Sequence, residues 1–419
     1  MLKSTNIAVT TVAFVIFACV AVFAAPVWVD NENATSVLGQ ANFTTGTGAA
    51  TAANLYQPSS VRFDPTSGKL FVTDCANYRI LRFANAQALV NGGAAEAAFG
   101  QPDLNTGTGG GNATQSKIGC AGEVTIDAGG HLWVADTDNS RVLRWDNAAT
   151  LASGQPANAV LGQPDFTTTF IATTQAKMAY PEGIFVDTAG TLWVADTANN
   201  RVLRFDNAAS KATGSNADAV LGQIDFLSNS PSMTQSNFAA PNSITGNATG
   251  SIWVSDSGNS RVLRFDVASA KANGGTADGI IGSSSYTSIP ANHLTRTSLD
   301  TPGGVTIDNQ NRLYVADAAN DRILIYNNAT TLPDGSQASN VLGQPNYTDA
   351  TARLTQSGFD MPYTPSWDST SGSLWVADLA NNRVLRFVPQ TPTAGNVSIS
   401  GRVLDRAGAG LRNAGVSYT

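Results

Sequence analysis

The sequence predicts an all-β fold, a six-bladed β-propeller, on the basis of three observations. A 14-residue segment at 132–145, read as Leu-Trp-Val-Ala-Asp-Thr-Asp-Asn-Ser-Arg-Val-Leu-Arg-Trp, occurs six times in varied form at spacings of 60 to 62 residues. A second motif, Val-Leu-Gly-Gln, also recurs six times, and 39 Gly and 17 Pro supply many turns. The aspartates that anchor the six segments are Asp74, Asp136, Asp196, Asp256, Asp317 and Asp378.

Each repeat is expected to form one four-stranded blade, as the third repeat illustrates. Residues 181–187 are predicted to be the inner strand, 192–196 the second, 200–205 the third and 219–222 the outer strand. Their nearly continuous apolar runs suit strands that are buried on both faces. One aromatic position in each second strand is expected to fill the layers between blades. These residues are Phe71, Trp133, Trp193, Trp253, Tyr314 and Trp375.

The ring is predicted to close through an N-terminal outer strand. The Val-Leu-Gly-Gln motif occurs once before the first blade and is missing after Phe387. The last blade therefore lacks an outer strand, while the N-terminal part has one to spare. We expect residues 36–40 to pair with residues 384–387, which removes the exposed edges that an open sheet would present.

The repeated pattern resembles the NHL-repeat family of propellers. It consists of an apolar strand that ends in Val-Ala-Asp, a short turn with Asn, and an Arg that opens the next apolar strand, and it covers residues 36–388. The extra length over typical NHL repeats falls in connections such as 206–218 and 223–240. Connections of the second kind share a Gly-Gln-Pro-Asp-Phe pattern, so we expect ordered loops on one face of the disc. The resemblance implies that the disc recognises a protein or another ligand.

A repeated Arg follows each anchoring Asp by five residues and is expected to form a structural ion pair with it. Because most arginines belong to the repeat and the net charge is -7, nucleic acid is not an expected partner. The expected pairs are Asp74 with Arg79, Asp136 with Arg141, Asp196 with Arg201, Asp256 with Arg261, Asp317 with Arg322 and Asp378 with Arg383.

The two ends of the chain are expected to lie outside the propeller, which spans 26–388. Lys3, the apolar stretch 7–23 and a small-residue cleavage site predict a signal peptide at 1–25, with an uncleaved anchor or lipidation of Cys19 as alternatives. Residues 389–396 are predicted to be a linker. Residues 397–419 resemble the opening of a carboxypeptidase regulatory-like β-sandwich. Two strands are too few to fold alone, so we expect a longer surface protein.

A disulfide is expected between the first two blades. Cys75 follows the anchoring Asp of the first repeat, and Cys120 precedes the inner strand of the second. The two positions lie on the same face of neighbouring blades, and an exported protein meets oxidising conditions. Two buried free thiols are the alternative.

The starts of the inner strands are expected to line the mouth of the central channel. Glu123, Glu182 and Asn242 stand there in three consecutive blades of a chain with only four Glu. Oxygen ligands of this kind suit Ca²⁺, and they loosely resemble the ligands of gluconolactonase-like propellers. A solvated mouth without an ion is the alternative. No catalytic residue is assigned, and His131 and His293 are too few for a three-histidine zinc site.

The sequence favours an exported, monomeric propeller that serves as a protein- or glycan-binding scaffold through its loop-rich face. The alternative function is a metal-dependent hydrolase of the lactonase or esterase class, with its cation at the channel mouth. A spacer within a secreted or cell-surface protein is the third interpretation. No membrane contact is expected beyond the export signal or an N-terminal anchor.

Overall fold

The computed structural model describes residues 26–109 and 112–391. They fall into two units, Trp28–Pro389 and the two chain ends, and every described strand belongs to the first unit. Within the second unit, Val27 and Gln390 exchange two backbone hydrogen bonds of 2.9 Å. The predicted signal at 1–25 and the predicted β-sandwich opening at 397–419 lie outside the described residues.

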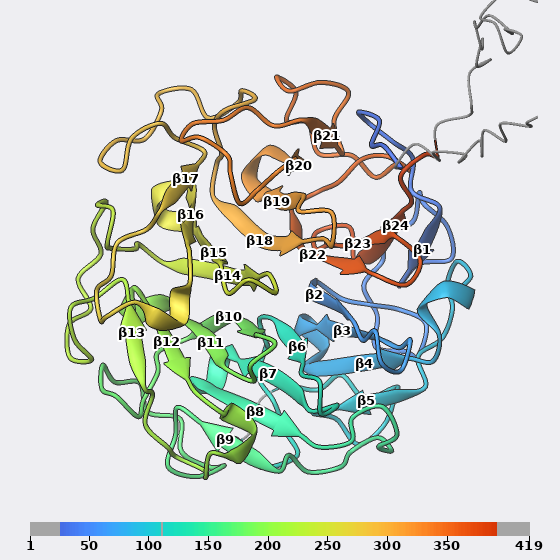
Figure 1. Ribbon diagram of the computed structural model, residues 1–419. Helices are drawn as coiled ribbons and strands as arrows, with labels where there is room; N and C mark the ends of the chain where they lie inside the picture. The colour runs from blue at the N-terminus through green and yellow to red at the C-terminus, as the bar shows by residue number, and fades with distance from the viewer. Residues whose placement is uncertain (1–25, 110–111, 392–419) are drawn as a thin grey trace, which may run out of the picture. The chain divides into compact units, whose positions relative to one another are not determined.

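The unit Trp28–Pro389 is the predicted six-bladed β-propeller, built from antiparallel four-stranded sheets around a central axis (Figure 1). Blades 1 to 6 begin in chain order with the inner strands β2 (Pro58–Phe63), β6 (Val124–Ile126), β10 (Pro181–Val186), β14 (Pro241–Gly246), β18 (Pro302–Ile307) and β22 (Pro362–Asp368). The second strands are β3 (Leu70–Asp74), β7 (Leu132–Asp136), β11 (Leu192–Asp196), β15 (Ile252–Asp256), β19 (Leu313–Asp317) and β23 (Ser373–Asp378).

The third and outer strands complete each blade. The third strands are β4 (Arg79–Phe83), β8 (Arg141–Trp145), β12 (Arg201–Phe205), β16 (Arg261–Phe265), β20 (Arg322–Tyr326) and β24 (Arg383–Phe387). The outer strands are β5 (Ala97–Phe99), β9 (Ala159–Leu161), β13 (Ala219–Leu221), β17 (Gly279–Ile281), β21 (Asn340–Leu342) and, in blade 6, β1 (Ser36–Leu38). Short 3-10 turns are η1 (Cys75–Asn77), η2 (Ala86–Ala88), η3 (Thr137–Asn139), η4 (Thr197–Asn199), η5 (Ala208–Ser210), η6 (Ser257–Asn259), η7 (Ala268–Ala270) and η8 (Ala318–Asn320).

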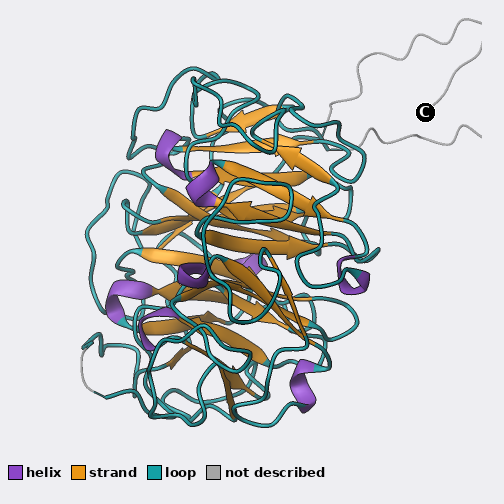
Figure 2. Ribbon diagram, turned by 90° about the vertical axis from the view of Figure 1, so that its left-hand side faces the viewer, coloured by secondary structure: helices purple, strands orange, loops and turns teal. Residues whose placement is uncertain are grey.

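The antiparallel order places three kinds of segment on one face of the propeller, which we call the loop face. These are the starts of the inner strands, the turns between second and third strands, and the connections that lead from each outer strand to the next inner strand. Figure 2 shows the sheets from the side, with loops around the strand ends. We call the long connections entry connections; they are residues 39–57, 100–123, 162–180, 222–240, 282–301 and 343–361.

Neighbouring blades pack face to face through apolar layers. Trp133 of β7, for example, lies in one cluster with Val194 and Leu203 of blade 3. The aromatic residue at this position of the second strand is at most 1% exposed in every blade. The aromatic column therefore belongs to the core, as the repeat predicts.

The ring closes through the N-terminal segment, over a longer stretch than the sequence predicts. β1 pairs with β24, with Val37 opposite Leu385. Upstream of β1, Asp30 Oδ1 accepts a hydrogen bond from Val341 N at 3.0 Å, and Asn31 N donates to Val341 O at 2.9 Å. These contacts fasten residues 30–31 to β21, the outer strand of blade 5.

The same two contacts occur within the link that joins β16 to β17 in blade 4. There Asn273 Oδ1 and Gly274 N bond the backbone of Val220 at 3.1 Å each. Asn31, with φ of 56°, adopts the left-handed conformation that Gly274 adopts with φ of 70°. The N-terminal segment thus supplies the outer strand of blade 6 and also the end of the link that leads into this strand. The two parts of blade 6 come from opposite ends of the propeller sequence, and the division falls within this link.

A buried Asp–Arg pair lies under each turn between the second and third strands. In blade 3, Arg201 Nε donates to Asp196 Oδ2 at 2.7 Å, and both side chains are fully buried. The other guanidinium hydrogens bond carbonyls of two entry connections, Phe226 on one side and Thr174 and Lys177 on the other. All six repeats hold such a pair, with N–O distances of 2.6–2.7 Å. Each arginine therefore anchors the backbone of the loop face.

Cys75 and Cys120 form a disulfide between residues 45 positions apart. Cys75 opens the turn η1 of blade 1, and Cys120 lies in the entry connection of blade 2. The bond thus joins two neighbouring blades on the loop face.

Candidate functional site

Four large apolar side chains are exposed on two neighbouring entry connections. Phe170 and Ile171 belong to connection 162–180, and Ile224 and Leu227 belong to connection 222–240. Their exposed fractions are 75, 56, 76 and 74%, respectively. Lys177 Nζ lies 5.8 Å from the centre of the Phe170 ring, within the range of a cation–π contact. We call the four apolar residues the apolar patch.

The two connections touch beside the apolar patch. Asn229 Nδ2 donates to Thr173 Oγ1 at 2.9 Å. Ile171 and Leu227 each lie two residues from this contact. Arg201 bonds carbonyls of both connections, so the patch stands on a fixed backbone.

The apolar patch departs from the repeat. At the position of Phe170 the other connections carry Thr or Ser, and at the position of Leu227 they carry Thr or Asn. Ile224 takes the place of Pro, Ser or Ala. The other five connections adopt their fold with these residues, so Phe170, Ile224 and Leu227 are not needed for folding.

A second candidate site lies at the channel mouth on the loop face. Glu182, Asn242 and Tyr363 are the second residues of the inner strands β10, β14 and β22. Asn242 Nδ2 donates to the Tyr363 hydroxyl at 2.7 Å, which links blade 4 to blade 6. Asn242 Oδ1 is buried and has no hydrogen-bond partner among the described residues. The carboxylate of Glu182 accepts no hydrogen bond from the described residues.

Glu123 lies below this mouth and is 4% exposed. Its carboxyl oxygens accept hydrogen bonds from Ile184 N at 3.1 Å, from Ser243 Oγ, and from Thr364 Oγ1 at 3.4 Å. These partners belong to blades 3, 4 and 6, so the Glu123 side chain crosses the channel. The oxygens of Glu123 are therefore hydrogen-bonded within the protein, whereas those of Glu182 accept no hydrogen bond from the described residues.

Burial raises the pKa of both glutamates. Desolvation raises the pKa of Glu123 to about 8, against the hydrogen bond from Ser243, which favours the charged form. Desolvation and the negative charge of Asp138 raise the pKa of Glu182 to about 7. Both carboxyl groups are therefore harder to ionise than those of exposed glutamates.

Arg62 on β2 is a channel residue that the sequence analysis overlooked. Desolvation lowers the pKa of its guanidinium, while the nearby carboxyl groups of Glu123 and Asp64 act in the opposite direction. The signal was present in the sequence, since the other inner strands carry Thr, Phe or Ser at this position. Those residues are Thr125, Phe185, Thr245, Thr306 and Ser366.

The described side chains at the mouth supply only part of the ligand set of a calcium site, so backbone carbonyls and waters would have to supply the rest. Ca²⁺ takes six to eight oxygen ligands, and the described mouth residues offer unused oxygens on Glu182 and Asn242 beside the Tyr363 hydroxyl. Within residues 26–109 and 112–391, no group of three or more His, Cys, Asp or Glu side chains is arranged to hold a metal ion. We therefore derive no reaction step through a metal.

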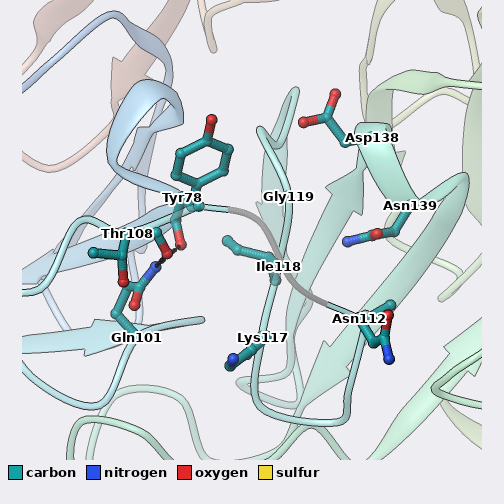
Figure 3. A pocket seen from close by; sticks show the side chains of 11 residues that line it. Tyr78, Gln101, Thr108, Asn112, Lys117, Ile118, Gly119, Asp138 and Asn139 are labelled. Atoms are coloured by element: carbon teal, nitrogen blue, oxygen red, sulfur yellow. Dashed lines mark hydrogen bonds between the residues drawn. The ribbon is translucent and has the colours of Figure 1, made fainter.

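A cavity of about 190 Å³ lies between blades 1 and 2 (Figure 3). Tyr78 and Gln101 line one side, and Lys117, Asp138 and Asn139 line the other. Residues 110 and 111, which follow the lining residue Gly109 in the sequence, lie outside the described residues. The cavity therefore carries no site assignment.

One repeat matches a known protein-family model. The model described as NHL repeat matches residues 178–205, which cover the start of blade 3 through its third strand. No curated protein matches the sequence. In the part of the chain that the structure describes, no helix has the length and hydropathy of a membrane span.

Several solved structures are similar in fold. A streptogramin B lyase is 12% identical, with 82% of this chain and 95% of that chain covered and a TM-score of 0.44. A catalytically inactive virginiamycin B lyase from Staphylococcus aureus with quinupristin is 14% identical, with 85% of each chain covered and a TM-score of 0.44. A structural genomics protein from Bacteroides thetaiotaomicron is 13% identical, with 85% and 75% covered and a TM-score of 0.48. Identities this low concern the fold alone.

Proposed function

We propose that the chain is an exported scaffold that binds a partner protein through the apolar patch on its entry connections. The observation that carries this proposal is the exposure of four apolar side chains, three of which stand at positions where the other connections carry Thr, Ser, Asn, Pro or Ala. Contiguous exposed apolar groups mark interaction sites, and the two connections that carry these side chains touch each other at Thr173 and Asn229.

The rigidity of the patch supports the proposal. The buried pair of Asp196 and Arg201 fixes both connections before any partner arrives. A fixed backbone lowers the entropy cost of binding. Burial of each large apolar side chain contributes about 1.5–3 kcal/mol, so a few of them can dominate the affinity of an interface.

The chemistry of the patch favours a protein over a glycan. Ile171, Ile224 and Leu227 are aliphatic and gain free energy by covering apolar area. A glycan presents mainly hydroxyl groups, and these lose free energy when they are buried without hydrogen-bond partners. The alternative function, a hydrolase with a cation at the channel mouth, rests on the unused oxygens of Glu182 and Asn242 alone.

Photocrosslinking tests the proposal at the patch itself. A benzoylphenylalanine at position 170 should give a discrete covalent adduct with one polypeptide from the producing cells. The same group at Val267, which is exposed on the opposite face of blade 4, is the matched control. The purified partner should then bind the intact chain, and the triple variant Phe170→Thr, Ile224→Pro, Leu227→Thr should weaken binding at least about tenfold.

Three results would contradict the proposal. Equal adducts from positions 170 and 267 would indicate nonspecific contact. An adduct sensitive to glycosidases would indicate a glycan. Full affinity in the triple variant, with an unchanged melting temperature, would place the interface elsewhere on the propeller.

A further inference from the structure

We infer that the channel mouth is a binding site for a primary alkylammonium group, and that this group is a lysine side chain of the partner protein. The identity of the lysine donor rests on the proposed function, whereas the ammonium site itself rests on Glu182, Asn242 and Tyr363. We call these three residues the mouth cluster.

The mouth cluster offers acceptors that an ammonium group would satisfy. Among the described residues, the carboxylate of Glu182 has no hydrogen-bond donor and the buried Oδ1 of Asn242 has no partner. The Tyr363 hydroxyl oxygen already accepts one hydrogen bond from Asn242 and can accept another. An ammonium nitrogen carries three donors and no acceptor, so three such oxygens match it.

The electrostatics of the mouth favour a cation over an anion. Asp138 acts on Glu182 as a second negative charge. Burial, and after it the negative charge of Glu182, raises the pKa of the Tyr363 hydroxyl. Arg62 lies three residues further along its inner strand than the level of the cluster, beyond Glu123. A buried carboxylate without a partner is costly, so a ligand that supplies a positive charge stabilises it.

Glu123 closes the channel below the mouth cluster, and we call the cluster together with this floor the cup. Glu123 bonds Ser243 and Thr364 from the opposite side of the channel and so forms a floor. Gly122 packs closely against Glu182, since a Cβ at this position would lie 2.9 Å from Glu182 Oε2 and 2.4 Å from Glu182 O. A cup closed below suits the end of a side chain.

The rim of the cup suits an alkyl stem. Tyr180 and Met361 directly precede the strands that carry Glu182 and Tyr363, and each is 46% exposed. The long apolar stem of lysine packs on such surfaces while its charged head reaches a polar partner. A tyrosine ring at the rim also attracts a cation through its face.

Ligand-observed NMR on the full-length chain tests the site with Nα-acetyllysine methylamide. The matched probe is Nα-acetylnorleucine methylamide, which has a similar stem without the ammonium group. The lysine probe should bind, and the norleucine probe should not. Glu182→Gln should weaken lysine binding about tenfold or more, because it removes a charge-assisted contact, and Tyr363→Phe should weaken it by less. Glu96→Gln, outside the channel, is the control variant.

The pH dependence gives a second readout that a merely structural role would not produce. Only the carboxylate form of Glu182 attracts the ammonium group. Because its pKa is about 7, affinity should rise about tenfold from pH 6 to pH 8. This rise should be absent in Glu182→Gln, whose melting temperature shows whether the variant is folded.

Four outcomes would overturn the inference. They are equal binding of the norleucine probe, no binding of the lysine probe, unchanged lysine affinity in folded Glu182→Gln, and Ca²⁺ that occupies the cup and excludes the lysine probe. The triple variant of the apolar patch leaves the cup intact and should bind the lysine probe normally. Failure of the cup and failure of the patch are therefore distinguishable.

Discussion

On the loop face, two pairs of neighbouring blades are joined by different kinds of contact. Between blades 3 and 4, Asn200 Oδ1 accepts a hydrogen bond from Ala240 N at 2.8 Å. Between blades 1 and 2, Tyr78 stands at the position of Asn200, and the disulfide joins the blades instead. The backbone N–H of Cys120 bonds Asp138 of its own blade at 2.9 Å.

The difference follows from the side chain at one turn position. Tyr78 and Asn200 both have left-handed backbones, with φ of 55° and 52°. The amide of Asn200 is short enough to bond the next connection twice, since its Nδ2 also donates to Asn229 O at 2.9 Å. A phenol cannot reproduce this geometry. A covalent bond is present where the hydrogen-bonding side chain of the repeat is missing.

The largest effect on this comparison is expected from the anchoring arginines. Arg201→Gln leaves Asp196 buried without its cation and should cost about 3–5 kcal/mol of stability. Arg79→Gln removes the same group in blade 1, where the disulfide still holds connection 100–123. In calorimetry, reductant should therefore lower the melting temperature of the Arg79 variant far more than that of the Arg201 variant. Equal sensitivity of the two variants would contradict the role of the disulfide.

Removal of the disulfide should have the next largest effect. The double variant Cys75→Ser, Cys120→Ser opens a 45-residue loop and should cost about 2–4 kcal/mol. Hydrogen exchange should accelerate in residues 112–123 and remain unchanged in residues 223–240. Acceleration of both segments to the same extent would show that the bond acts on the whole ring.

Loss of the amide contact should have a smaller effect, confined to the other pair of blades. Asn200→Ala removes two hydrogen bonds and should cost about 1–2 kcal/mol of local stability, read as faster exchange in residues 223–240. Tyr78→Asn in the disulfide-free variant should regain about 1 kcal/mol, because it restores the contact between blades 1 and 2. No gain there would mean that the two chemistries are not equivalent.

The smallest effect is expected at Val267, where the residue departs from the repeat. Val267 has a left-handed backbone with φ of 46°, whereas Asn147, Asn207 and Asn328 occupy the same position in three other blades. Val267→Asn should raise stability by about 1 kcal/mol, because a β-branched side chain is strained there. Urea unfolding would measure the gain, and a loss of stability would show that the Val267 side chain makes a useful contact.

The sequence predicts the repeated features of the propeller better than its singular ones. The blades, the Asp–Arg pairs and the pairing of residues 36–40 follow from a pattern that recurs six times. The earlier start of the closure, at Asp30, was hidden because Asn31 stands where the other blades have Gly. Its left-handed backbone is visible only in the structure.

The channel residues were harder to predict for a physical reason. Glu123 meets Ser243 and Thr364 across separations of 120 and 241 residues, and no local pattern encodes such contacts. The sequence could select Glu123 and Glu182 as unusual, but it could not show that one carboxyl group is already satisfied and the other is not. Tyr363 was not selected, because its contact with Asn242 spans 121 residues.

Because blade 6 combines β1 with strands from the other end of the propeller, the ring can close only late in folding. Val37 pairs with Leu385, so the strand that is synthesised first waits for the one that is synthesised last. At roughly 5–20 residues per second, a ribosome needs about 20–70 s to make the chain between them. Ring closure therefore cannot precede the synthesis of β24, and until then β1 has no strand to pair with.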